Sequence, residues 1–127
     1  MTPLNVLVVD DEPNIRKMLS VSLSTDGHRV TTVSNGHDAI VQAARRPFDL
    51  AFVDLRLGTE QGMDLVPQLL AESAWMRVVV ITAFATIETA VEAIRRGASD
   101  YLPKPFTPAQ VWLAIQGRPA RTDLAQS

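Results

Sequence analysis

Leu50-Ala51-Phe52-Val53-Asp54-Leu55 is an apolar run interrupted by a single carboxylate near its end. A run of about four to eight apolar residues between polar segments is typical of a strand buried on both faces of a parallel sheet. A charge at the carboxyl end of such a strand lies at the rim of the sheet, so we expect Asp54 to be presented rather than buried. A second apolar run, residues 4–9, ends in Asp10 and Asp11. If the two strands are neighbours, three carboxylates meet at one edge.

The rest of the chain alternates between strand and helix patterns. Strands are expected at residues 29–33, 77–81 and 100–102, and helices at 15–23, 39–43, 63–70, 87–94 and 107–115. This alternation predicts an α/β fold, a doubly wound, flavodoxin-like (βα)5 parallel sheet in three layers with strand order 2-1-3-4-5. That order places Asp10, Asp11 and Asp54 together. Thr82 and Lys104 then follow the two remaining strands at the same edge.

Two positions in the predicted helices need interpretation. Pro67 is compatible with a helix only in or near the first turn, so we expect that helix to begin around residue 63 or 64. Trp112 is expected in the core. The alternative is a surface position, where it would join Ile87, Val91 and Tyr101 near a face suited to partner or dimer contacts.

The bulk properties are those of one small domain. The chain has 127 residues, 46% of them hydrophobic, which is enough to bury its own core. We expect one domain over residues 1–117, and we interpret residues 118–127 as a linker stub toward an absent output domain. The formal net charge of -2 gives no electrostatic argument for nucleic acid binding by this chain.

Several classes of protein are excluded or disfavoured by residue content. The chain contains no cysteine, so a disulfide framework and a thiolate metal site are impossible. Its first residues lack the basic and apolar segments of a signal peptide, and no apolar run approaches the length that spans a bilayer. We therefore expect a cytoplasmic protein that does not contact a membrane.

The carboxylates at the predicted edge of the sheet indicate which cation and which reaction this edge could support. Three carboxylates held close together repel one another unless a cation or protons offset their charge. With only oxygen ligands in the group, Mg²⁺ is favoured over zinc or copper. An Asp carboxylate can act as a nucleophile toward phosphorus and form an acyl phosphate. Lys104 and Thr82 would then supply a positive charge and a hydroxyl donor to the phosphoryl oxygens.

Four sequence segments carry a resemblance to a known family. Together they resemble, in the right order and over nearly the whole chain, the receiver domain of bacterial two-component response regulators. The segments are Val8-Val9-Asp10-Asp11-Glu12, Val53-Asp54-Leu55, Val80-Ile81-Thr82-Ala83 and Gly97-Ala98-Ser99-Asp100-Tyr101-Leu102-Pro103-Lys104-Pro105-Phe106.

The resemblance implies a set of roles at the predicted edge. Asp54 would be phosphorylated by a sensor histidine kinase or a small phosphodonor. Asp11, Asp54 and the main-chain carbonyl of Arg56 would ligate Mg²⁺, and Asp10 would act chiefly through a bound water. Phosphorylation would favour a homodimer and control an attached transcriptional output domain, without direct contact between this domain and nucleic acid.

The resemblance also implies a conformational switch. Lys104 would sense the phosphoryl group, and the bond from Lys104 to Pro105 would be cis. Thr82 and Tyr101 would be the switch pair that changes the surface of the fourth helix, the fifth strand and the fifth helix.

Within the family, the segments at residues 54–58 and 75–79 resemble receivers of NtrC-type transcriptional activators. The chain departs from the family at Gly58, where most receivers carry proline. Glycine makes the loop after Asp54 more flexible, so the loop geometry of the family is a less direct guide to the geometry of this loop.

Two alternative functions remain open. A pseudo-receiver would bind partners without being phosphorylated, and it usually lacks a pocket residue, whereas none is missing here. A phosphatase with an aspartyl nucleophile would carry that nucleophile after the first strand, with a second acid two residues later and a following Gly-Thr. The segment Asp10-Asp11-Glu12-Pro13 does not match that pattern.

Overall fold

The computed structural model describes residues 2–117, in which a five-stranded parallel sheet forms the centre of the molecule. The strands of this sheet follow one another in the spatial order β2-β1-β3-β6-β7. Their bounds are Asn5–Val9 (β1), Arg29–Val33 (β2), Leu50–Asp54 (β3), Arg77–Thr82 (β6) and Asp100–Pro103 (β7). This is the predicted order 2-1-3-4-5, because β6 and β7 are the fourth and fifth strands of the sheet.

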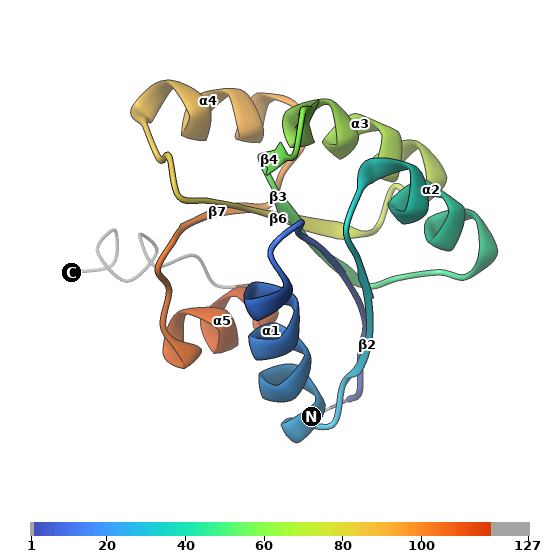
Figure 1. Ribbon diagram of the computed structural model, residues 1–127. Coiled ribbons are helices and arrows are strands. Elements are labelled where there is room, and N and C mark those ends of the chain that lie inside the picture. The colour runs from blue at the N-terminus through green and yellow to red at the C-terminus, as the bar shows by residue number, and fades with distance from the viewer. Residues whose placement is uncertain (1, 118–127) are drawn as a thin grey trace.

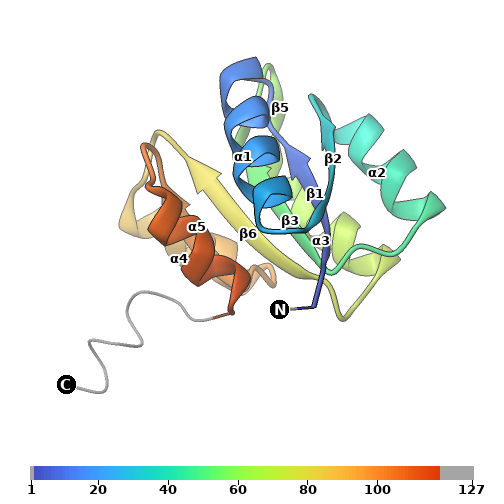
Figure 2. The ribbon, with the colours of Figure 1, turned by 90° about the horizontal axis from the view of Figure 1, so that it is seen from below.

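Five helices cover the two faces of the sheet and make three layers (Figure 1). They are α1 (Pro13–Thr25), α2 (Gly36–Arg45), α3 (Gly62–Glu72), α4 (Ile87–Arg95) and α5 (Pro108–Ile115). Helices α2, α3 and α4 lie on one face, and α1 and α5 lie on the other, as the view from below shows (Figure 2). The doubly wound (βα)5 prediction is therefore confirmed.

Each face has its own hydrophobic core, because successive side chains of a strand point to opposite sides. In β3, Ala51 and Val53 pack toward α2, α3 and α4, whereas Leu50 and Phe52 pack toward α1 and α5. All residues of β3 are buried. The apolar run at residues 50–55 thus contains the central strand, which both cores share.

Local signals fix the ends of several helices. The Asn35 side chain accepts a hydrogen bond from the Asp38 N–H at the start of α2, and Thr86 and Thr107 form capping boxes at α4 and α5. Gly97, just after α4, has a φ of 109°, a conformation that glycine adopts without the steric cost paid by other residues.

The connection after β3 differs from the prediction of a simple loop. Residues Arg56–Leu57 (β4) and Glu60–Gln61 (β5) pair as a small antiparallel hairpin. Helix α3 then begins at Gly62, earlier than expected, which places Pro67 inside the helix as its sixth residue. Pro67 is exposed, and because it lacks an N–H it leaves the carbonyl of Met63 without its helical donor.

The expected core position of Trp112 is wrong. Helix α5 buries Val111, Ala114 and Ile115 as one stripe. Trp112 directly follows Val111 in the sequence, lies off this stripe and is 47% exposed. A step of one residue turns a helix by about 100°, which carries the ring out of the core. The apolar stripe of α4 is also at the surface, where Ile87 is 81% exposed.

No helix within residues 2–117 is both long enough and apolar enough to cross a membrane. The predicted linker, residues 118–127, lies outside the described part of the chain.

Candidate functional site

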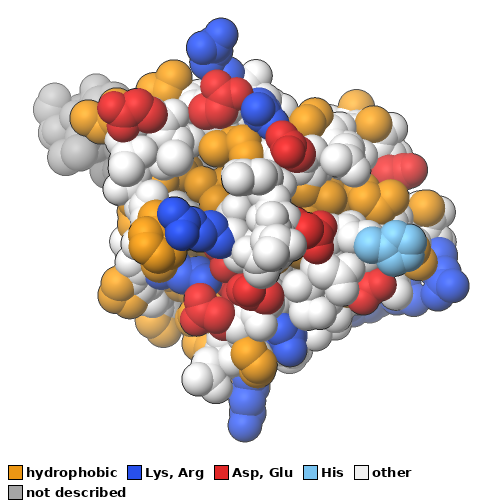
Figure 3. Space-filling model, turned by 45° about the horizontal axis from the view of Figure 1, so that its top comes forward, with side chains coloured by type: hydrophobic (Ala, Val, Ile, Leu, Met, Phe, Trp, Pro, Cys, Tyr) orange, Lys and Arg blue, Asp and Glu red, His pale blue; other side chains and the backbone are white. Residues whose placement is uncertain are grey.

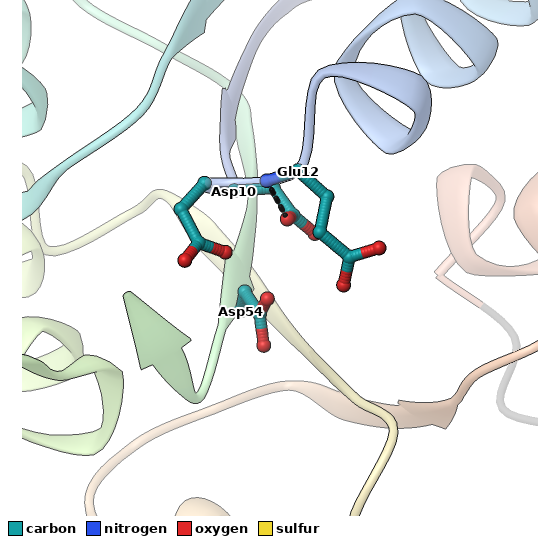
Figure 4. Close-up of side chains that lie close together, drawn as sticks. Asp10, Glu12 and Asp54 are labelled. Carbon is teal, nitrogen blue, oxygen red and sulfur yellow. Dashed lines mark hydrogen bonds between the residues drawn. The ribbon is translucent and has the colours of Figure 1, made fainter. Parts of the chain in front are cut away.

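The carboxyl ends of β1 and β3 lie side by side and bring three aspartates to one edge of the sheet. Val9 of β1 pairs with Val53 of β3, so Asp10 follows β1 at the level where Asp54 ends β3. Asp10, Asp11, Glu12 and Asp54 each offer a carboxylate oxygen, and these oxygens all lie within 4.8 Å of one another. In the close-up, carboxylates from the two strand ends lie close together (Figure 4). The predicted meeting of Asp10, Asp11 and Asp54 is present in the structure.

Lys104 provides the positive charge of this group. Its Nζ lies 2.9 Å from Asp10 Oδ2, 3.0 Å from Glu12 Oε1 and 3.0 Å from Asp54 Oδ2. The lysine side chain is only 7% exposed, so these contacts are poorly screened by water. The Lys104–Pro105 bond is cis, in agreement with the resemblance.

Burial and charge shift two pKa values in the site. Burial raises the pKa of Asp10 to about 6, although the Glu12 N–H and Lys104 partly oppose this change. For Lys104, burial lowers the pKa, but hydrogen bonds to Asp10, Glu12 and Asp54 outweigh it and raise the pKa above its ordinary value. The lysine therefore stays protonated, and Asp10 takes up a proton more readily than an ordinary aspartate does.

The expectation that Asp54 is presented rather than buried is wrong. Asp54 ends its strand at the rim, as expected, but it is only 4% exposed. Lys104 lies against it, and Arg56 and Phe84, from the segments that follow β3 and β6, line a cavity of about 200 Å³ over it. The rim of the sheet is thus the floor of a pocket.

The strand ends share one local geometry. Asp10 Oδ1 accepts the Glu12 N–H at 2.9 Å, Asp54 Oδ1 accepts the Arg56 N–H at 3.1 Å, and Thr82 Oγ1 accepts the Phe84 N–H. In each case a side-chain oxygen accepts the N–H of the residue two positions later. The side chain therefore folds over the start of the loop that follows its strand. These bonds fix one oxygen of each aspartate, and the other oxygen of each faces the cation Lys104 Nζ.

Thr82 and Tyr101, the predicted switch pair, are not bonded to each other here. Thr82 is 1% exposed, and its hydroxyl lines a neighbouring cavity of about 290 Å³. The Tyr101 hydroxyl lies 2.6 Å from Oγ1 of Thr89 on α4. Thr89 also belongs to the capping box of α4 with Thr86, so the tyrosine is joined to the start of that helix.

Two features of the site were not predicted as functional. Glu12 is not among the predicted site residues, but its side chain makes no cap at the start of α1 and contacts Lys104 instead. The guanidinium of Arg56 lies over the Phe84 ring, 3.9 Å from its centroid. For Glu12, adjacency to Asp11 was an available signal. For Phe84, only its place shortly after a strand at the same edge could have indicated it.

The space-filling view shows acidic side chains near the middle of one face, beside basic and hydrophobic ones (Figure 3). The donor set of the acidic group consists of carboxylate oxygens, the ligands that hard divalent cations prefer. Asp10 Oδ2 is buried beside Lys104 Nζ, and within residues 2–117 it accepts no hydrogen bond of standard geometry. These residues therefore fit Mg²⁺.

Known proteins are similar in sequence to this chain. The model of the response regulator receiver domain matches residues 6–116. The alginate biosynthesis transcriptional regulatory protein AlgB of Pseudomonas putida is 44% identical over 109 residues, which are 86% of this chain and 24% of AlgB. The regulatory protein AtoC of Escherichia coli is 36% identical over 117 residues, 91% of this chain and 25% of AtoC. The chain spans about a quarter of the length of these relatives.

A solved structure shares the fold. The crystal structure of a response regulator from Burkholderia pseudomallei, with a phosphorylated aspartic acid, a calcium ion and citrate, has a TM-score of 0.87. It is 32% identical, and the match covers 97% of this chain and 71% of that one. These comparisons confirm the resemblance drawn from the sequence motifs, including that to NtrC-type activators.

Proposed function

Since the chain belongs to the response regulator receiver domain family, we propose that it is a phosphorylation-dependent signalling switch and that Asp54 accepts the phosphoryl group. One observation carries this assignment. Asp54 lies in the acidic group, with Oδ1 bonded to the Arg56 N–H and Oδ2 to Lys104 Nζ. Its carboxylate is oriented by the main chain and lies next to the cation that a phosphoryl group needs.

The donor we propose is the phosphohistidine of a sensor histidine kinase, or a small molecule such as acetyl phosphate. An Asp54 oxygen forms a bond to phosphorus while the bond from phosphorus to the donor nitrogen breaks, and the electron pair stays on the imidazole. The product is an acyl phosphate on Asp54. Apart from this self-phosphorylation and the later hydrolysis of the acyl phosphate, we assign no enzymatic activity to the domain.

The remaining residues offset charge. Asp11, Asp54 and the main-chain carbonyl of Arg56 are the residues we assign to Mg²⁺, with Asp10 acting chiefly through water. Bound Mg²⁺ would neutralise charge on the phosphoryl oxygens. Lys104 Nζ moves partly away from Asp54 and donates a hydrogen bond to a phosphoryl oxygen instead.

The conformational response begins at Thr82. Its hydroxyl donates to the phosphoryl group, the loop after β6 moves inward, and Tyr101 gives up its bond to Thr89 to fill the space. Because a ligand shifts an equilibrium only by its differential affinity, this conformation is a minor state before phosphorylation. The surface that changes comprises α4, β7 and α5, where Ile87 and Trp112 are exposed.

We infer that this surface favours a homodimer after phosphorylation and controls a transcriptional output domain attached beyond the linker at residues 118–127. The relatives support an output domain, since each is named as a regulatory protein and is about four times as long as the matched part. The net charge of -2 supports a domain that does not itself contact nucleic acid.

Intact mass spectrometry after incubation with acetyl phosphate and Mg²⁺ tests the proposal. We expect one phosphoryl adduct on the native chain, dependent on metal and labile in base. Asp54→Asn should abolish it, and the exposed Asp26→Asn, remote from the edge, should not.

Failure to form an adduct with acetyl phosphate or with a phosphorylated histidine kinase would contradict the phosphoacceptor role and favour the pseudo-receiver. Repeated turnover of a generic phosphate ester would favour the phosphatase. An adduct that persists in Asp54→Asn would assign the reaction to another residue.

A further inference from the structure

The hairpin after β3 reaches back to the acidic group through one main-chain N–H. Gly58, in the turn between β4 and β5, donates this N–H to Asp11 Oδ2 at 3.0 Å, although the two residues are 47 positions apart. Asp11 is exposed, and within residues 2–117 this is its only hydrogen bond to protein. The hairpin therefore holds a carboxylate that water alone would leave free to rotate.

Only a restricted set of residues can make this contact at position 58. The φ of Gly58 is 63°, in the left-handed region that glycine enters readily and that most other residues avoid. A proline would lack the N–H and would fix φ near -65°, so it would lose both the donor and the conformation. A Cβ at this position would meet nothing within 4 Å, and asparagine enters the left-handed region at a lower cost than most other residues, so it is the substitution that best keeps this turn.

Other contacts hold the hairpin in place. Leu57 is 3% exposed and packs into the core under α2 and α3. Glu60 Oε2 accepts the N–H of Gly36 at the start of α2, at 3.3 Å. At the end of the hairpin, the Gly62 N–H donates to the Leu55 carbonyl at 2.8 Å. The donor at position 58 is thus presented by a supported turn.

We propose that Gly58 is a positioning residue for the metal site. Its N–H holds one oxygen of Asp11, so that the other oxygen is directed into the acidic group before the cation arrives. Restricting an exposed side chain in advance lowers the entropic cost of binding. This inference rests on the proposed function, because it concerns how the chain prepares to bind Mg²⁺.

The test compares Mg²⁺ affinity, measured by isothermal titration calorimetry with Mg²⁺ alone, in the native chain, Gly58→Pro and Gly58→Asn. We expect Gly58→Pro to bind about three- to tenfold more weakly, the effect of freeing one side chain. Gly58→Asn keeps the N–H and should bind like the native chain. Acetyl phosphate kinetics should show a higher half-saturating Mg²⁺ concentration in Gly58→Pro with an unchanged maximal rate.

Gly27→Pro is the matched control. Gly27 also has a positive φ, 90°, has open space around it, and donates its N–H, but to Ser24 at the end of α1. Its replacement should lower the free energy of unfolding without changing Mg²⁺ affinity. Urea unfolding in EDTA checks that each variant is folded.

A measurement on the native chain covers the case in which Gly58→Pro does not fold. In a Mg²⁺ titration followed by NMR, the Gly58 amide should shift with the same dissociation constant as the Asp11 and Asp54 amides. A Gly58 amide that does not respond, equal affinity in folded Gly58→Pro, or equal weakening in Gly58→Asn would overturn the inference. Absence of Mg²⁺ binding by the native chain would instead contradict the proposed function.

Discussion

Lys104 Nζ lies 3.0 Å from Asp54 Oδ2, although the two residues are 50 positions apart along the chain. The same ammonium contacts Asp10 and Glu12, and its side chain is 7% exposed. One lysine is therefore the counter-ion of Asp10, Glu12 and Asp54, in the place where a phosphoryl group on Asp54 would need a cation.

Replacing this lysine should destabilise the chain in the absence of metal. Lys104→Met leaves the buried Asp10 and Asp54 without their cation, and breaking such a pair costs on the order of 3 kcal/mol. We expect the free energy of unfolding in EDTA, measured with urea, to fall by about this amount. Saturating Mg²⁺ should recover part of the loss, because the metal offsets the same charges.

The chain has only one other lysine, Lys17, which is exposed on α1. Lys17→Met is therefore a matched control and should change stability by less than about 0.5 kcal/mol. A Lys104→Met variant as stable in EDTA as Lys17→Met would show that the ammonium contributes no net stability at this edge.

Asp10 should make stability depend on pH in a direction unusual for a carboxylate. Burial raises its pKa to about 6 in the folded chain, above its ordinary value of 3.8. Between these values the folded state binds more proton than the unfolded state, so the free energy of unfolding decreases as the pH rises from about 4 to 6. The contribution is at most about 3 kcal/mol, since one pKa unit corresponds to about 1.4 kcal/mol.

Urea unfolding of the native chain and Asp10→Asn across this pH range, in EDTA, isolates the effect. The difference in unfolding free energy between the two proteins should move in favour of Asp10→Asn as the pH rises, because the amide has no charge to bury. A difference that is constant with pH would contradict the raised pKa.

Tyr101 should report the conformational switch through its bond to Thr89. The two hydroxyl oxygens are 2.6 Å apart, and Tyr101 is the only tyrosine in the sequence. In protein labelled with fluorotyrosine, we expect a single ¹⁹F resonance that shifts on incubation with acetyl phosphate and Mg²⁺. Asp54→Asn should not show this shift.

Thr89→Val removes the hydroxyl with little change in shape. We expect it to move the ¹⁹F resonance of the unphosphorylated chain part of the way toward the phosphorylated position, because Tyr101 loses its partner in the resting state. Thr86→Val loosens the same capping box without removing the bond to Tyr101 directly, and should move the resonance less. Equal shifts in the two variants would assign the effect to the helix cap.

The sheet and the site could largely be predicted from sequence, because buried parallel strands appear as continuous apolar runs and their carboxyl ends share one edge. Asp10, Asp11, Asp54 and Lys104 follow directly from that rule. The burial of Asp54 could not be predicted, since it depends on loops that lie over the edge.

Other features that could not be predicted from the sequence also depend on packing between distant segments. The hairpin β4–β5 has strands of two residues each, too short for any periodic pattern. Its contact with Asp11 depends on a left-handed Gly58, which composition alone does not reveal. Trp112 lies in a helix with apolar residues on several sides, so the sequence does not indicate which side is buried.

Arg77 should stabilise α5 from the other end of the sheet. Its guanidinium donates to the carbonyl of Ala114 at 2.9 Å and to that of Ile115 at 2.6 Å, two carbonyls in the last turn of the helix. Burial lowers the pKa of Arg77, and the charge of Asp49 opposes this shift. We expect Arg77→Met to lower the free energy of unfolding by on the order of 2 kcal/mol, because two half-buried carbonyls lose a charged donor.

Arg77→Lys keeps the charge but cannot donate to both carbonyls in the planar geometry of a guanidinium, so it should recover only part of this loss. Arg95, exposed in the last turn of α4, is the control, and Arg95→Met should cost less than about 0.5 kcal/mol. Native-state hydrogen exchange locates the effect, since the Val111 amide and the others of α5 should exchange faster in Arg77→Met while those of α1 change only with global stability. Uniform acceleration in α1 and α5 would mean that Arg77 supports the sheet rather than α5.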